Sequence, residues 1–558
     1  MRSLSLTAAG MLAGSTLAVT LIALPIGAQT LPNPPADPTA PARVARGLIV
    51  ELKSTGAAAS NRQAPQALRD QLASVARTAG LPAPNATVRQ VGARGYLLNF
   101  AAPLQGAALD AAVQSVTANP AVQSVSPDVR LHRLDTAPND PEFVNDDQWY
   151  LRNSDDPAGG AAALNTPLAW DVTTGLSGPV VAVVDTGALF SHQDLASQFI
   201  PGYDLISDVT AGNTGLGRNP DASDPGDWIS RSDLRNPDFA GCTVEPSSWH
   251  GSFIAGIIGA ATNNAIGVAG INWNAQIQPV RVAGKCGSWL SDAVDGLRWA
   301  AGGSVDGVPD NPTPARIINV SFGGAEACEP TYQSAIDDAV ARGALVVVAA
   351  GNSNTALGSP ANCSGVLAVG AVRQDGLKTF YSSFGAGISL MAPGGSGEDT
   401  LPNDTITSTS NTGTQGPVAD TYTQSEGTSF AAPMAVGVAS LMLAVNPSLT
   451  PAQLIKLLQQ SARPFPNNPN YPVCGNTINT ACNCTPQTCG AGLLDASAAV
   501  QLASGGSLDN GSNSQSANAN SSQGGGGAMG WLWGLGLWGL AALALWQRHR
   551  AAVQSQQA

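Results

Sequence analysis

Three residues far apart in the chain could together perform nucleophilic chemistry. Asp185 ends the apolar run that begins at Val180, His250 lies in Ser-Trp-His-Gly-Ser-Phe-Ile-Ala-Gly, and Ser429 lies in Gly-Thr-Ser-Phe-Ala-Ala-Pro. Acyl transfer needs a hydroxyl nucleophile, a base that takes its proton and a group that orients the base. Each residue alone also has a structural interpretation: a turn cap for the Asp, a satisfied structural role for the His and a helix N-cap for the Ser. The three together, in this order, favour the chemical interpretation.

The surrounding sequence predicts how these residues are positioned. From about residue 137, β-branched apolar runs alternate with helical stretches; the runs cover 180–184, 277–282, 317–320, 345–349 and 366–369, and the helices 290–301, 332–342, 428–445 and 451–462. Nearly continuous apolar strands separated by helices indicate a parallel sheet that is covered on both faces. Reactive groups collect at the carboxyl ends of such strands, where Asp185 lies.

With these motifs the chain resembles the subtilisin-like serine peptidases (subtilases) from about Gln148 to Val500. The segments that begin at Asp185, His250 and Gly427 match the family's Asp, His and Ser segments. The order Asp, His, Ser differs from the orders of trypsin-like enzymes and α/β-hydrolases. The resemblance implies an α/β fold with a parallel seven-stranded sheet and helices on both faces.

The resemblance also implies a secreted serine endopeptidase. Ser429 would attack the peptide carbonyl, His250 would transfer the proton, and Asp185 would orient the imidazole. One departure is that Ser252 and Phe253 replace a Thr and a second His of the family, so the packing beside His250 can differ. The segment between Asp185 and His250 is also longer than in minimal members, and we interpret its part around 221–228 and Cys242 as a surface insertion over the rim of the cleft.

Further residues enter through the same resemblance. Asn352, at the end of Val-Val-Val-Ala-Ala-Gly-Asn, would donate its side-chain amide to the oxyanion together with the Ser429 backbone N–H. The segment 317–324 would pair with the substrate as an added strand. The walls of the pocket for the residue before the cleaved bond would be Ser321, Phe322, Gly323, Ala349, Ala350 and Gly351.

Two other functional classes compete with this interpretation. A catalytically silent binding or adhesion protein could use the same fold, but the triad and Asn352 are all present. A lipase or esterase would need Gly-x-Ser-x-Gly, which the sequence around Ser429 does not provide. With 26 Lys and Arg against 39 Asp and Glu, a formal net charge of −13 argues against a nucleic-acid partner.

The N-terminal part predicts export and a precursor. Residues 1–28 are typical of a signal peptide, with an N-terminal membrane anchor as the alternative, and residues 29–43 form a Pro-rich linker. Residues 44–136 predict a ferredoxin-like β-α-β-β-α-β module. By resemblance this module is an inhibitory and folding-assisting propeptide of the inhibitor I9 type, cut within 131–137; an unrelated accessory domain is the alternative.

The C-terminal part predicts a sorting tail. After the main domain at 137–503 come a Gly/Ser/Asn linker at 504–527, an apolar helix at 528–547 and a basic tail at 548–558. About nineteen apolar residues just span a bilayer. The tail resembles GlyGly-type sorting signals of Gram-negative bacteria, which implies transient membrane retention and then cleavage; a permanent anchor stays open. The protein is therefore expected outside the cytoplasm, either secreted or attached to the cell envelope.

A calcium site is a further expectation from the family. The resemblance implies a structural Ca²⁺ held by side-chain and carbonyl oxygens of Asp140, Asp194, Thr262, Asn264, Ile266 and Val268. These are all oxygen donors, as Ca²⁺ requires. A plain turn at Asn263-Asn264 is the alternative.

Eight cysteines in an exported chain predict disulfides. We expect Cys242 to pair with Cys286 and Cys328 with Cys363, because these segments should lie near one another around the cleft. The remaining four cysteines are Cys474, Cys482, Cys484 and Cys489. They can form disulfides in three different connectivities. The alternative is a zinc site, although their spacing is not that of a standard structural zinc site.

Overall fold

A computed structural model describes residues 44–53, 66–78, 89–92, 94–129, 136–397, 404–475 and 480–507. The chain divides into two compact units, Met1–Leu134 and Asp135–Ala558. The predicted signal peptide, Pro-rich linker, apolar C-terminal helix and basic tail lie outside the described residues, as does most of the predicted cleavage segment.

The first unit has the element order that the sequence predicts. Its elements are β1 (Val44–Leu52), α1 (Gln66–Thr78), β2 (Arg89–Val91), β3 (Gly95–Gln105), α2 (Gly106–Thr117) and β4 (Val122–Val129). The strands form one sheet in the order β2-β3-β1-β4, with antiparallel neighbours. Leu48 and Val50 of β1, Leu72 of α1 and Val116 of α2 are fully buried and form its core.

The second unit is built on a seven-stranded sheet in the order β11-β10-β9-β8-β5-β7-β6. All its pairings are parallel. The strands are β5 (Val180–Asp185), β6 (Tyr203–Asp204), β7 (Gln276–Arg281), β8 (Ile317–Val320), β9 (Leu345–Ala349), β10 (Val366–Val372) and β11 (Leu390–Pro393). The expected parallel seven-stranded α/β sheet is thus observed.

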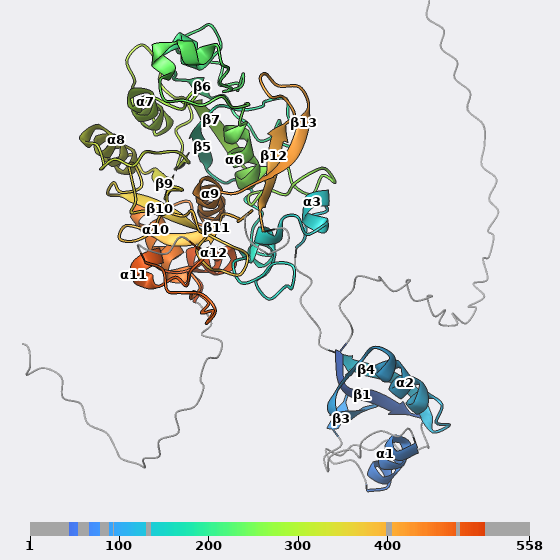
Figure 1. The fold of residues 1–558 in the computed structure, drawn as a ribbon. Coiled ribbons are helices and arrows are strands. Elements are labelled where there is room, and N and C mark those ends of the chain that lie inside the picture. The colour runs from blue at the N-terminus through green and yellow to red at the C-terminus, as the bar shows by residue number, and fades with distance from the viewer. Residues whose placement is uncertain are drawn as a thin grey trace, which may run out of the picture. The chain divides into compact units, whose positions relative to one another are not determined.

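Helices cover the sheet in two groups (Figure 1). One group packs α7 (Leu290–Ala300) against α8 (Pro330–Ala341), and the other packs α6 (His250–Gly259) against α9 (Thr428–Val445). Because both faces are covered, the central strands are buried along their whole length and consist mainly of Val, Ile, Leu and Ala. The remaining helical elements are α3 (Pro141–Val144), η1 (Trp149–Leu151), α4 (Thr166–Trp170), α5 (Val209–Gly212), η2 (Asp233–Arg235), η3 (Pro237–Phe239), α10 (Pro451–Ser461), α11 (Pro486–Cys489) and α12 (Ala496–Ala503).

A separate antiparallel hairpin, for which the sequence pattern gives no signal, lies beside α6. It consists of β12 (Ile406–Asn411) and β13 (Asp420–Ser425). β12 is fully buried although most of its residues are Ser or Thr. The hydroxyls of Ser408 and Thr409 donate to backbone carbonyls of α6, which compensates for the burial of these polar groups.

Helix α9 runs through the interior. Among the described residues it is the one helix long and apolar enough to cross a membrane, yet 83% of it is buried in this unit. It contacts β8, β9, β10, β11, α6 and α12. Its composition therefore reflects a central core helix, and its first turn carries Ser429.

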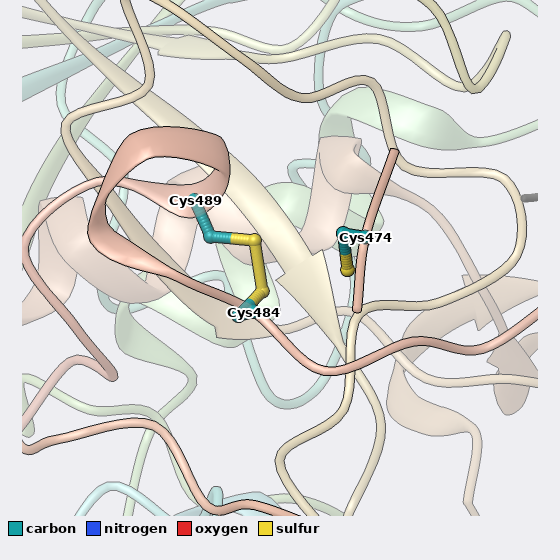
Figure 2. A group of neighbouring side chains, drawn as sticks. All are labelled: Cys474, Cys484 and Cys489. Carbon is teal, nitrogen blue, oxygen red and sulfur yellow. A yellow bond between two sulfur atoms is a disulfide. The ribbon is translucent and has the colours of Figure 1, made fainter. Parts of the chain in front are cut away.

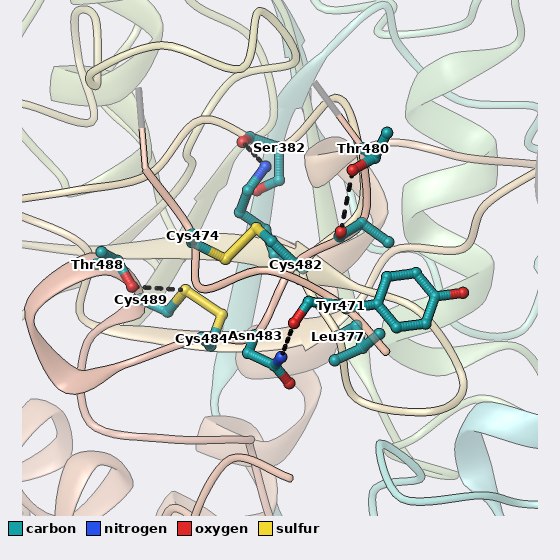
Figure 3. Close-up of a disulfide and its surroundings, with 12 residues drawn as sticks. Leu377, Ser382, Tyr471, Cys474, Thr480, Cys482, Asn483, Cys484, Thr488 and Cys489 are labelled. Carbon is teal, nitrogen blue, oxygen red and sulfur yellow. Dashed lines mark hydrogen bonds between the residues drawn. A yellow bond between two sulfur atoms is a disulfide. The ribbon is translucent and has the colours of Figure 1, made fainter. Parts of the chain in front are cut away.

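All eight cysteines are paired. The structure joins Cys242 to Cys286 and Cys328 to Cys363, which are the two expected pairs. It also resolves the four last cysteines as two local bridges, Cys474–Cys482 and Cys484–Cys489, which lie side by side (Figure 3). Three of their sulfurs come within 4.8 Å of one another (Figure 2), but each is already in a disulfide, so the zinc alternative has no thiolate to use.

Candidate active site

Asp185 and His250 form the centre of the site. Asp185 ends β5 and is 1% exposed, and His250 is the first residue of α6. His250 Nδ1 lies 2.8 Å from Asp185 Oδ1 and 3.0 Å from Oδ2. The carboxylate also accepts a bond from the Thr186 backbone N–H at 2.8 Å. This arrangement fixes the ring and leaves Nε2 as the nitrogen that can exchange a proton with a second group.

The charges around His250 favour its protonated form. Burial, the largest single effect, lowers the pKa of His250, but the carboxylates of Asp185, Asp227 and Asp224 together outweigh it. The pKa is therefore raised above its ordinary value of about 6.5. The imidazole side chain keeps 25% exposure, which leaves it open to a substrate.

Ser429 lies near His250 at the start of α9, where the ring of the next residue, Phe430, packs 5.9 Å from the His250 ring. It is the second residue of that helix, after the N-cap Gly427 and Thr428, so it is not itself the N-cap. Its hydroxyl donates to the Ser321 carbonyl at 2.9 Å, and the Ser321 hydroxyl donates to the Ser429 carbonyl at 2.9 Å. The hydroxyl thus bonds to β8's end rather than to His250, and a side-chain rotation is needed to bring it to Nε2.

Asn352 follows β9 and is oriented by α9. Its side-chain oxygen accepts bonds from the Thr428 backbone N–H at 2.9 Å and from the Thr428 hydroxyl at 2.8 Å. The same hydroxyl accepts a bond from the Gly351 N–H. Because Oδ1 is held by these two donors, the Nδ2 amide is the part of the side chain that can donate outward. Asn352 and Ser429 line one pocket.

That pocket contains all the residues expected to form a substrate wall. It measures about 330 Å³ and is lined from β8's end by Ser321, Phe322 and Gly323, and from β9's end by Ala349, Ala350 and Gly351. Further lining comes from Thr355, Gly358, Ser359 and Ser383. The lining carries no Asp, Glu, Lys or Arg, so the pocket suits an uncharged group.

Phe253, one of the two departures from the family motif, packs beside the base. Its ring lies 4.4 Å from that of Phe430, which in turn lies 5.9 Å from the ring of His250. Ser252, the other departure, donates no bond to the triad: its hydroxyl accepts from the Leu189 N–H at 2.9 Å. Both residues support α6 and leave the Asp185–His250 contact in place.

The interpretation of residues 221–228 as a surface insertion is wrong for its central part. Asp224 is only 3% exposed and accepts a 2.8 Å bond from the Thr186 hydroxyl, directly behind Asp185. Gly187, with φ +111°, fits this close approach: a Cβ there would come within 2.8 Å of the Ala222 carbonyl. The sequence offered no periodic or motif signal for this buried carboxyl.

A second residue that the sequence analysis missed is Lys378. It is fully buried, and its ammonium donates to Asn354 Oδ1 at 2.9 Å and to the carbonyls of Thr379 and Ser382 at 2.8 and 2.9 Å. Burial lowers the pKa of Lys378 to about 8. Its backbone forms an antiparallel bridge with Cys482, so the disulfide region holds it beside the pocket loops.

Five of the six residues expected to bind calcium are joined by hydrogen bonds at the far end of α6. The hydroxyl of the sixth, Thr262, bonds to Ala260 and Gly270 instead. Asp140 accepts from the Asn263 N–H at 2.7 Å; Asp194 accepts from the Asn264 side chain at 2.8 Å and from the Val268 N–H at 3.0 Å. Both carboxylates are fully buried, and among the described residues no ion pair reaches either. Burial, with a smaller contribution from Asp140, raises the pKa of Asp194 to about 6. The donors are oxygen atoms without a countercharge, which fits Ca²⁺.

Comparisons with known proteins give the family of the chain. The model of the subtilase family matches residues 177–526. The chain is 40% identical to an extracellular protease of Xanthomonas campestris pv. campestris, over 84% of this chain and 75% of that protein. It is 37% identical to an extracellular basic protease of Dichelobacter nodosus, over 70% of this chain and 60% of that protein. A solved protease of Pseudoalteromonas arctica superposes with a TM-score of 0.58 at 42% identity, over 66% of this chain and all of that one.

Proposed function

The chain belongs to the subtilase family, and from this premise we propose that it is an extracellular serine endopeptidase with Asp185, His250 and Ser429 as its triad. One observation carries the proposal. The paired Asp185–His250 side chains, the Ser429 hydroxyl and the Asn352 amide come from four different elements and meet at the carboxyl edge of a single sheet, beside one uncharged pocket.

In the acylation step Ser429 Oγ adds to the carbonyl carbon of the substrate while its proton moves to His250 Nε2. The carbonyl π-electrons move to oxygen and give a tetrahedral oxyanion. When this oxyanion collapses, the C–N bond breaks and His250 gives its proton to the leaving amine. Water then repeats the sequence on the acyl-enzyme, which releases the acid and restores the Ser429 hydroxyl. Asp185 orients the imidazole and stabilises the imidazolium.

Asn352 and the Ser429 backbone N–H would donate to the oxyanion. Thr428 supports this role because it binds the side-chain oxygen of Asn352 and so turns the amide nitrogen to the pocket. An extended substrate would run along residues 321–323 as an added strand, and its side chain would enter the pocket lined by Ala349, Ala350 and Gly351.

The N-terminal unit would act as an inhibitory and folding-assisting propeptide. Its support is a ferredoxin-like sheet of four strands in the order β2-β3-β1-β4, with its own buried core, placed before the peptidase unit. A separate core allows this unit to be removed without unfolding the second one. Processing would fall within 131–137, and a signal peptide and a sorting tail would take the protein out of the cytoplasm.

Calcium would stabilise the peptidase unit through Asp140, Asp194 and Asn264, with carbonyls of Thr262, Ile266 and Val268. When bound, the ion would neutralise two buried carboxylates that have no cationic partner among the described residues. It would take no part in proton transfer, because its ligands lie at the opposite end of α6 from His250.

Expression of the full chain with Ser429→Ala tests the proposed function. The wild type is expected to lose its N-terminal unit and to digest casein, whereas the variant should keep the precursor mass and lose at least about 10⁴-fold in turnover. Intact-mass spectrometry and N-terminal sequencing follow the processing. If both forms keep the same mass and neither digests casein, the protein is a silent member of its fold and the proposal fails.

A further inference from the structure

The first turn of α6, which carries His250, has an unusual set of N-terminal caps. The residue in the capping position is Trp249, whose side chain makes no capping bond. The first N–H groups of a helix have no partner within the helix and must find one elsewhere. Here the N–H of His250 donates to the Ser248 hydroxyl at 3.2 Å, and the N–H of Gly251 donates to the Thr186 hydroxyl at 3.0 Å.

Both hydroxyls are in turn held by carboxylates of one short segment. The Ser248 hydroxyl donates to Asp227 Oδ2 at 2.7 Å, and the Ser248 N–H donates to Asp227 Oδ1 at 2.7 Å. The Thr186 hydroxyl donates to Asp224 Oδ2 at 2.8 Å. Since each hydroxyl gives its only proton to a carboxylate, its lone pairs face the helix N–H groups. Through these hydroxyls, Asp227 and Asp224 hold the first two N–H groups of α6, those of His250 and Gly251.

The same segment is anchored to the turn that follows the triad Asp. The Ala188 N–H donates to the Ala222 carbonyl at 3.0 Å, and the Asp224 N–H donates to the Ala188 carbonyl at 2.9 Å. Thr186 completes the connection, because its own N–H donates to Asp185 while its hydroxyl bridges Asp224 and Gly251. A displacement of Asp224 would therefore move Asp185 and His250 relative to one another.

The charges that surround Asp224 come from four elements. Asp227 lies on the same segment, Asp185 ends β5, Arg281 ends β7 and His250 begins α6. Arg281 donates to the Thr186 carbonyl at 3.0 Å and pairs with Asp204 at 2.6 Å, so its charge is already shared. Burial, followed by the charge of Asp227, raises the pKa of Asp224 to about 7. Asp224 and Asp227 in turn raise the pKa of His250.

We propose that Asp224 is a positioning residue of the triad, with Asp227 as its weaker partner: through Thr186 it fixes Asp185 against His250, and its charge favours the imidazolium formed in each proton transfer. The inference rests on the proposed peptidase function. It gives the long segment between β6 and α6 a role in the chemistry, although no atom of Asp224 needs to touch the substrate.

Kinetics of Asp224→Asn, Asp227→Asn and the control Asp221→Asn test the proposal. Asp221 is an exposed carboxylate on the same segment whose contact is the local Ser223 N–H. Enzyme concentration is taken from titration with a fluorophosphonate, so that only folded active sites count. For Asp224→Asn we expect kcat on a peptide anilide to fall about 10- to 100-fold with KM within about twofold, as for a small misplacement of catalytic groups. For Asp227→Asn we expect a smaller fall in kcat, because the Asp227 side chain is partly exposed.

The pH profile separates positioning from a merely structural role. Asp224 is ionised near and above pH 7, so its replacement by Asn lowers the pKa of His250 and should move the acid limb of kcat/KM slightly to lower pH. The limb should stay in place in Asp221→Asn. The proposal is overturned if Asp224→Asn matches Asp221→Asn in both kcat and the acid limb while Ser429→Ala still abolishes turnover. If Ser429→Ala retains turnover, the proposed function itself fails.

A second pair of variants keeps the proposal testable if Asp224→Asn fails to mature. Thr186→Ser retains the bridging hydroxyl, and Thr186→Val has the shape of Thr without it. We expect Thr186→Ser to keep kcat within about threefold of the wild type, and Thr186→Val to have a kcat at least about 10-fold lower. Equal kcat values for the two variants would contradict a link through Thr186.

Discussion

The two sides of the active site are supported by opposite charges. On the base side, His250 is backed by the carboxylates of Asp185, Asp224 and Asp227. On the oxyanion side, the loops that carry Asn352 and Ser383 are held by neutral hydroxyls and by the buried ammonium of Lys378, which binds only neutral oxygens. In the transition state of the proposed mechanism a positive imidazolium and a negative oxyanion form together. Each support therefore has the charge opposite to the one that develops on its side.

Substitution of Asn352 by Ala should give the largest effect on the oxyanion side. We expect kcat to fall about 10²- to 10³-fold, since one of the two oxyanion donors is lost, while KM changes little. The acid limb of the pH profile should stay in place, because no charge near His250 changes. A shift of that limb as large as the one in Asp224→Asn would contradict the division of the site into two electrostatic sides.

Lys378→Met should weaken the support of the oxyanion side. The change removes the donor of the Thr379 and Ser382 carbonyls, and each unpaired buried acceptor costs about 1–3 kcal/mol. We expect the free energy of unfolding to fall by about 3 kcal/mol or more, as measured by denaturant unfolding of the inhibitor-blocked enzyme, which prevents autolysis. Lys456→Met, which alters an exposed lysine of α10, is the matched control and should leave stability unchanged.

Removal of a disulfide should lower the free energy of unfolding more on the base side than on the oxyanion side, with a smaller difference than the effects above. Cys242–Cys286 joins the base-side segment to the loop after β7 across 44 residues, whereas Cys474–Cys482 closes only 8 residues near Lys378. In the chain-entropy account, these loops correspond to about 4 and about 2.5 kcal/mol of stability. Double Cys→Ser variants of each pair, compared by denaturant unfolding, should therefore differ by about 1.5 kcal/mol. An equal loss would mean that native contacts, rather than loop length, set the contribution.

Calcium affinity at the predicted site, at the far end of the helix that carries His250, should depend on pH. The metal needs an ionised Asp194, whose pKa is raised to about 6, so calcium affinity should rise as pH increases through 6. Affinity at pH 7 should exceed that at pH 5 about tenfold, or about 1.4 kcal/mol. Isothermal titration calorimetry of the inhibitor-blocked enzyme measures it, with Asp194→Asn as the control. An affinity that does not change between pH 5 and pH 7 would exclude Asp194 as a ligand.

The sequence was sufficient for the parts of the fold that depend on local pattern. Apolar runs predicted five of the seven strands of the large sheet, and the motifs around Asp185, His250 and Ser429 singled out residues that the structure brings to one edge of that sheet. The two edge strands, β6 and β11, were missed because β6 has only two residues and the short β11 ends in Pro. The Ser- and Thr-rich β12 could not be predicted from apolar runs either, because hydroxyl bonds to α6 allow its polar residues to be buried. Asp224 and Lys378 were missed for a related reason: their burial depends on partners more than 20 residues away in the sequence.

Covalent labelling tests the central claim most directly. A fluorophosphonate reacts with a serine hydroxyl only where a base and an oxyanion site activate it. We expect one adduct per mature wild-type chain, located on Ser429 by peptide mass spectrometry, and no adduct in Ser429→Ala or His250→Ala. An adduct on another residue, or a wild-type chain that digests casein without reacting, would contradict the assignment of Ser429 as the nucleophile.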